Sequence, residues 1–179
     1  MPIALTAALF ILSILLVAAI FKLSSQEKYS SLKKIHREKK LGSLISAIAL
    51  SWGGIQGYEL LGQDFPSVAG IIPILTPTLI IGVYFLMDYI FTRAFGGLII
   101  MLVCELFYRS QDFEMPVRFV FSFIGYAFAI AAMYMVGQPW RFRDYLFKSA
   151  VNEQFGSKLA GAITVALVVM FIPFVIAYV

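Results

Sequence analysis

Three carboxylates lie within or at the ends of long apolar runs, where an ionised side chain is costly to hold. Asp88 falls in the stretch PILTPTLIIGVYFLMDYIFTR, Glu59 ends the apolar run before it, and Glu105 lies in the run after it. A central Asp or Lys in a membrane helix costs about 2.5–3.5 kcal/mol on insertion scales. Such groups must therefore face protein or water, where they could bind a proton or a cation or form a structural ion pair.

The position of each carboxylate along its helix separates these roles. Helices over 70–91 and 95–109 would place Asp88 about 10 Å from the bilayer centre and Glu105 about 5 Å from it. We therefore expect Asp88 to anchor a helix end and Glu105 to be the most deeply embedded charge. Arg109 follows Glu105 by four residues, a spacing that allows an ion pair within one helix. A proton or cation site and a structural pair, within the chain or with a partner subunit, both remain open.

A second polar feature precedes these residues. Trp52, Gln56, Glu59 and Gln63 recur at helical spacing and form a stripe that should not face lipid. The glycines of residues 53–57 include a GxxxG spacing, which is typical of close helix packing in membranes.

Several reaction classes lack their usual residues. The chain has one cysteine, Cys104, and one histidine, His36, which argues against disulfides, haem, diiron and zinc centres. The sequence also lacks a GxSxG serine centre, an HExxH motif, a P-loop and a glycine-rich dinucleotide fingerprint. We expect no cofactor and no metal, and we assign no catalytic residue.

The composition indicates a chain whose solvent is lipid. Of its 179 residues, 61% are hydrophobic and 13% are charged, and the mean hydropathy is +0.89. Soluble domains are about 45–50% apolar and about 25% charged. The sequence therefore predicts an all-α integral membrane protein.

Six apolar runs are long enough to be read as membrane-spanning helices, although the fourth is the shortest. They form a single transmembrane domain over residues 1–179, with helices expected at 3–23, 44–62, 70–91, 95–109, 117–137 and 159–178. The third and fourth are joined by a tight turn at residues 92–94.

The basic residues predict the orientation of this six-helix bundle. Twelve of the 14 lysines and arginines fall on one side of the predicted bundle, and the two exceptions are Arg109 and Arg118. Cytoplasmic loops carry such an excess of basic residues. We expect both termini outside and a location in the bacterial cytoplasmic (inner) membrane. Because the basic residues gather on one predicted side of the membrane, membrane orientation accounts for the net positive charge. We therefore do not expect nucleic acid as a partner.

Two loops on the basic side are predicted to be amphipathic segments, 24–42 and 139–156. In the first, Ser24 and Glu27 have the spacing of a capping box, and in the second Pro139 opens a helix that ends at Gly156. Their cations would bind anionic lipid at the cytoplasmic face or dock a protein partner. The basic residues concerned are Lys33, Lys34, Arg37, Lys39, Lys40, Arg141 and Arg143.

A weak repeat is also visible, because Glu-Leu, Gln-Asp-Phe and Pro recur in order in 59–66 and 105–116. It predicts two hairpins of the same orientation, as in some transporters. Two unrelated polar turns are the alternative.

Three functions remain open. The favoured one is a non-catalytic subunit or scaffold of a larger membrane complex, energy-transducing complexes included. The second is a small ion or solute transporter or channel that uses Glu105. The third is a lipid-modifying membrane enzyme, which the missing catalytic residues disfavour.

Overall fold

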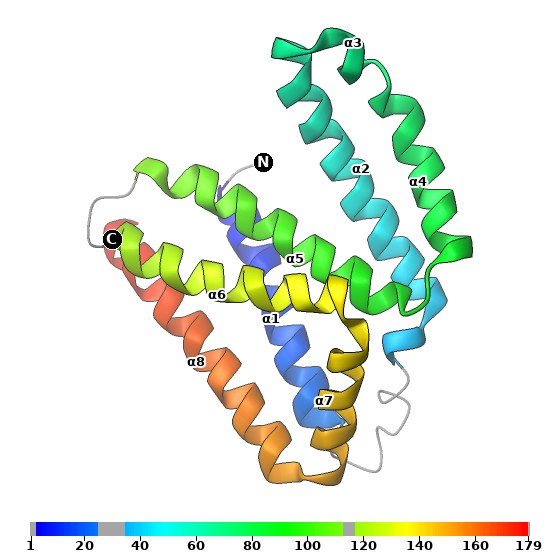
Figure 1. Ribbon diagram of the computed structural model, residues 1–179. Coiled ribbons are helices and arrows are strands. Elements are labelled where there is room, and N and C mark those ends of the chain that lie inside the picture. The colour runs from blue at the N-terminus through cyan, green and yellow to red at the C-terminus, as the bar shows by residue number, and fades with distance from the viewer. Residues whose placement is uncertain (1–2, 25–34, 113–116, 179) are drawn as a thin grey trace.

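The computed structural model describes residues 3–24, 35–112 and 117–178, and Figure 1 shows that the described residues form helices joined by short turns. No strand occurs in these ranges. The helices are α1 (Ile3–Leu23), α2 (Lys39–Asp64), α3 (Pro66–Ala69), α4 (Ile72–Leu86), α5 (Ile90–Arg109), α6 (Val117–Gly137), α7 (Pro139–Val151) and α8 (Glu153–Tyr178), with a 3₁₀ turn, η2, at Ser110–Asp112. The all-α prediction is confirmed for this part of the chain.

Five helical segments of the described chain are long and apolar enough to cross a membrane. They are Leu5–Leu23, Pro66–Leu86, Ile90–Tyr108, Arg118–Gly137 and Glu153–Ile172. The second of the six expected spans, 44–62, lies within α2, which does not belong to this group because serine, glycine and the polar stripe dilute its apolar residues.

The body of the protein is formed by α1, α5, α6 and α8, with α7 packed across one end (Figure 1). Its core includes Phe10 from α1, Leu102 from α5, Phe121 from α6 and Met170 from α8, all essentially without solvent contact. Phe10 packs edge-on against Phe128, with ring centroids 5.6 Å apart. Burial of large side chains from four helices gives the body one continuous core.

Helix α5 is the central element of this arrangement. It packs on α1, α2, α6 and α7. In its most apolar stretch, within Ile90–Tyr108, 56% of the residues are buried, compared with 6% in the corresponding stretch of Pro66–Leu86, which contains α4. Because α5 is covered on most sides, the groups at its two ends are fixed relative to the other helices.

Helices α2 and α4 form a hairpin that projects from the body, closed at its tip by α3 (Figure 1). Only α2 connects this hairpin closely to the body, through its contact with α5, and the main neighbour of α4 is α2. Gly42 makes the α2–α5 contact possible, because a Cβ atom there would lie 2.5 Å from the Phe91 backbone nitrogen.

The break between the third and fourth expected helices is displaced from its predicted position. Residues 92–94 do not form a turn, since they lie inside α5, which begins at Ile90. The chain turns at residues 87–89 instead, so Asp88 lies outside the helix that was expected to contain it. Burial of Ile90, Phe91 and Phe95 in the body explains why α5 continues through the predicted turn.

The second amphipathic segment is helical, as predicted, but it is shorter. Pro139, Phe142, Leu146 and Ser149 line the buried face of α7, which ends at Val151. Gly156 does not close this helix. It lies in α8, where its missing Cβ leaves room for the Phe21 carbonyl oxygen of α1.

The first amphipathic segment is described only in part. Residues 25–34, with Glu27 of the expected capping box and with Lys33 and Lys34, lie outside the described residues. A short 3₁₀ turn at residues 35–37 precedes α2, which begins at Lys39 instead of residue 44. The proposed repeat stays a prediction, since residues 113–116 of its second copy are likewise not described.

Two adjacent glycines of α5 provide a test of this packing. A Cβ on Gly96 would lie 2.8 Å from the Ala132 carbonyl oxygen of α6, whereas one on Gly97 would meet nothing within 4 Å. We expect Gly96→Val to lower the free energy of unfolding by about 1–3 kcal/mol through overpacking. Gly97→Val, the control, should leave it nearly unchanged. The thermal stability of both variants in detergent measures this, and equal losses would contradict the α5–α6 packing.

Candidate functional site

A polar groove lies between α2 and α5, in the half of α5 that ends at Arg109. Its volume is about 670 Å³. It is lined by Trp52, Ile55, Gln56, Glu59, Leu60, Gln63, Cys104, Glu105 and Tyr108. The stripe on α2 and the carboxylate on α5, identified separately in the sequence, thus face one common groove.

Glu105 is held by α2. The Gln56 side-chain amide donates a hydrogen bond to a Glu105 carboxylate oxygen across 3.0 Å, at a partly buried position. The bond links the projecting hairpin to the central helix. The expected ion pair with Arg109 stays a prediction, because that side chain lies outside the described residues.

The depth expected for Glu105 changes with the start of α5. The helix runs over Ile90–Arg109, so its middle lies between Ile99 and Ile100. Glu105 is then about 8 Å from the middle of the helix, instead of the expected 5 Å. The groove consequently occupies one half of the helical bundle.

A second hollow of about 490 Å³ lies between α2 and α4, and Glu59 borders both. In this hairpin the glycine that allows close packing is Gly54, where a Cβ would lie 2.5 Å from the Thr76 hydroxyl. Gly53 and Gly57, which form the GxxxG spacing, would accept a Cβ at ordinary contact distances of 3.7 and 3.6 Å. The GxxxG pair therefore contributes less to the packing of α2 against other helices than Gly54 does.

The groove offers carboxylates and amides to a ligand that carries hydrogen-bond donors. Glu59 and Gln63 are exposed, and Glu105 is partly buried. Carboxylates accept hydrogen bonds from cationic or polar donors. The groove is therefore suited to a proton, a cation or a donor side chain of another protein.

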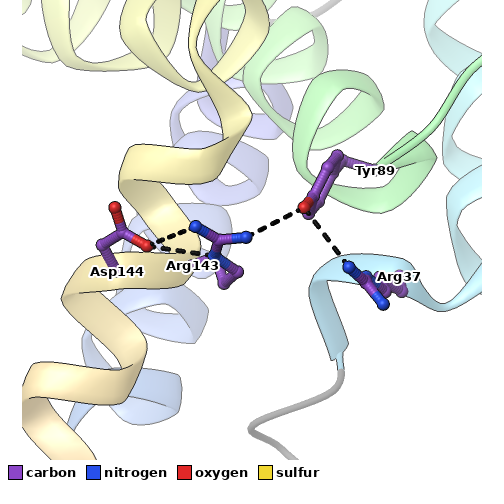
Figure 2. A network of polar contacts seen from close by, with 4 residues as sticks. All are labelled: Arg37, Tyr89, Arg143 and Asp144. Carbon is purple, nitrogen blue, oxygen red and sulfur yellow. Dashed lines mark hydrogen bonds and ion pairs between the residues drawn. The ribbon is translucent and has the colours of Figure 1, made fainter.

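The opposite end of α5 carries a basic cluster, which Figure 2 shows. The Arg37 and Arg143 guanidinium groups both donate to the Tyr89 hydroxyl, across 3.4 and 3.2 Å. Arg143 also forms an ion pair with Asp144 at 2.8 Å. Residues 35–37 and α7, which the sequence assigned to one membrane face, thus meet the turn at residues 87–89 at one end of the bundle.

Tyr89, at the centre of this cluster, has a strained backbone conformation. Its φ of 58° and ψ of 36° lie in the left-handed region, and no other described non-glycine residue has a positive φ. A bulky residue held there costs about 1–3 kcal/mol. The buried His36 ring stacks on the Tyr89 ring at 5.4 Å, which helps to fix this conformation together with the two arginines.

The same contacts change the acidity of the cluster. The hydrogen bond from Arg37 is the largest cause of a lowered pKa for the Tyr89 hydroxyl, and the Arg143 charge adds to it. The hydrogen bond to Asp144 raises the pKa of Arg143. Both shifts follow from pairing each ionised form with an opposite charge.

The other predicted site residues are distributed over this end of the molecule. Asp88 is exposed and, with Arg37, Lys39 and Tyr89, lines a pocket of about 310 Å³. It lies in the connection between α4 and α5 and not inside the expected helix 70–91, and its role as an anchor of a helix end stays a prediction. Lys40 is exposed on α2, and the Arg141 guanidinium lies 5.5 Å from the centre of the Tyr134 ring.

Sequence reasoning missed Tyr89 and the buried position of His36. Tyr89 is separated from its partners by 52 and 54 residues, and no motif spans these distances. Neither glycine nor proline marks the turn at residues 87–89.

Comparisons of the chain with protein families, with curated proteins and with solved structures found no match.

The Tyr89 cluster predicts a specific titration. Tyr89 should lose its proton below the usual tyrosine pKa of about 10, and Arg37→Gln should move its pKa upward. Because the folded chain then releases this proton at a lower pH than the unfolded chain, the contribution to stability is present above that usual pKa. It is lost as the pH falls through the folded value.

Phenolate absorbance, with the Tyr89→Phe titration subtracted, isolates this group from the other tyrosines. Lys40→Gln, which removes a nearby cation of the same segment, is the control and should leave the pKa of Tyr89 nearly unchanged. An identical titration in wild type and Arg37→Gln would show that the guanidinium does not bind the hydroxyl.

Proposed function

We propose that this chain is a non-catalytic subunit of a larger membrane protein complex, and that the groove between α2 and α5 receives a transmembrane segment of a partner. The partner segment would carry a hydrogen-bond donor or a cationic side chain opposite Glu59 and Glu105. A complex of the energy-transducing kind is included in this proposal.

The groove is the observation that supports the proposal. Polar side chains that face hydrocarbon without a partner are unfavourable, because lipid offers no hydrogen bonds in return. Glu59 and Gln63 are exposed along the groove. A partner helix would cover these groups and satisfy their hydrogen bonds, as polar residues do between membrane helices.

The α2–α4 hairpin adds to this argument. No residue of α4 is buried, and its packing is mainly against α2. A helical hairpin held by one helix leaves both of its flanks accessible, so a partner could contact α2 and α4 together.

The proposal includes a topology. The polar α2 would be the sixth crossing, beside the five apolar segments of the described chain. The basic cluster would lie at the cytoplasmic face, with both termini outside, in the inner membrane of a bacterium. Anionic lipid would contact the basic residues of this face.

A transporter or channel is the second candidate, favoured by the same groove. Glu105 would take up a proton or cation, with Gln56 holding the carboxylate. In this case water would fill the groove. A lipid-modifying enzyme is a weaker alternative, since the groove holds carboxylates, amides, a tyrosine, a tryptophan and the Cys104 thiol, and the sequence contains none of the catalytic motifs considered above.

Photo-crosslinking in native membranes tests the leading proposal. A benzophenone amino acid at Leu60, which lines the groove, should form a discrete adduct with a second polypeptide. The same probe at Phe123, which is exposed on α6 and outside the groove, is the matched control and should give none. Native gels after mild extraction should show the 20.0 kDa chain migrating with that partner.

A chain that migrates alone or as a simple homo-oligomer, with no adduct at Leu60, would contradict the proposal. The transport alternative would gain support if such a chain carried an ion or solute flux in proteoliposomes that Glu105→Gln abolished without loss of folding.

A further inference from the structure

Another groove, largely apolar, lies at the end of the body where α7 packs. It has a volume of about 450 Å³, within the range of about 300–1,000 Å³ that is usual for ligand pockets. Its lining comes from α1, α6, α7 and α8 and consists of Val17, Phe21, Ala131, Tyr134, Met135, Arg141, Phe142, Tyr145, Leu159 and Ile163. It shares no lining residue with the groove between α2 and α5.

The residues of this groove divide into an apolar interior and a polar rim. Val17, Met135 and Ile163 offer hydrocarbon to a ligand, whereas Tyr134 and Tyr145 carry a hydroxyl on an apolar ring. Tyrosine, like tryptophan, is enriched in membrane proteins where hydrocarbon meets the headgroups. The groove thus matches a molecule with an apolar chain and a polar head.

Arg141 gives the rim its charge. It is the only charged residue among those that line the groove. Its guanidinium lies over the Tyr134 ring, 5.5 Å from the ring centre, a cation–π contact that places the side chain at the rim. In the described part of the chain no carboxylate pairs with Arg141, whereas its neighbour Arg143 is paired with Asp144.

We infer that this groove binds one anionic membrane phospholipid, with an acyl chain between α6 and α8 and the phosphate headgroup on Arg141. A guanidinium with no carboxylate partner forms charge-assisted hydrogen bonds to phosphate oxygens, often two at once. The apolar lining residues would surround the acyl chain without placing a hydrogen-bonding group against it. The proposal is independent of the partner proposed for the groove between α2 and α5.

Native mass spectrometry of the full-length protein in non-ionic detergent tests this site. The protein is titrated with phosphatidylglycerol and, separately, with phosphatidylcholine of the same acyl chains. Wild type should bind a first phosphatidylglycerol more tightly than a first phosphatidylcholine. Arg141→Gln should weaken the phosphatidylglycerol step about tenfold or more, with little effect on phosphatidylcholine.

Two further variants separate the head from the chain. Ala131→Trp, which places a large side chain at the exposed edge of the groove, should weaken both lipids. Lys158→Gln removes an exposed cation of α8 that does not line the groove, so both titrations should match wild type. Far-UV circular dichroism and gel filtration verify that each variant is folded.

Wild-type affinity for phosphatidylglycerol in Arg141→Gln would overturn the proposal, and this exposed position is suited to substitution without loss of the fold. Equal binding of the two lipids by wild type would overturn it as well. Binding of both lipids to a folded Ala131→Trp variant at wild-type strength would show that they bind elsewhere.

Discussion

Burial of α5 between its neighbours is the constraint on which the rest of the structure depends. Its side chains Phe95, Leu102 and Leu106 fill the core of the body, and its other flank receives α2 at Gly42. Because one rigid helix carries Tyr89 before its first turn and Glu105 near its last, the basic cluster and the polar groove lie at opposite ends of the same element. Loss of α5 packing would therefore disturb both.

Polar contacts link the other segments to this helix. The bond from Gln56 to Glu105 joins the α2–α4 hairpin to the body, and the bonds from Arg37 and Arg143 to Tyr89 join the chain before α2 and the helix α7. In hydrocarbon such contacts add to dispersion forces, because apolar helices gain little from leaving lipid. Ile45 and Trp52 of α2 pack against the core of the body, and the polar bond from Gln56 and the close approach at Gly42 further fix the position of the hairpin.

Long apolar runs in the sequence predicted most of the long helices, and the regular spacing of Phe142 and Leu146 predicted α7. Burial or lipid contact follows directly from such patterns. The sequence also identified Gln56 and Glu105, each as a polar residue in an apolar setting, but their bond depends on how α2 docks against α5. The turn at residues 87–89 could not be predicted, since the left-handed conformation of Tyr89 is stabilised by arginines more than 50 residues away. The start of α5 moved with that turn, and the depth of Glu105 changed accordingly.

The sixth crossing is the least apolar element of the proposed topology, and α2 is therefore the helix to test. Single cysteines at Lys40 and Asp64, near the two ends of α2 and outside the groove lining, can be labelled in intact cells with a membrane-impermeant maleimide after Cys104 is replaced by serine. We predict labelling of Asp64→Cys from outside and labelling of Lys40→Cys only after the membrane is opened. Equal labelling of both sites in intact cells would place α2 on one side of the membrane and contradict the account.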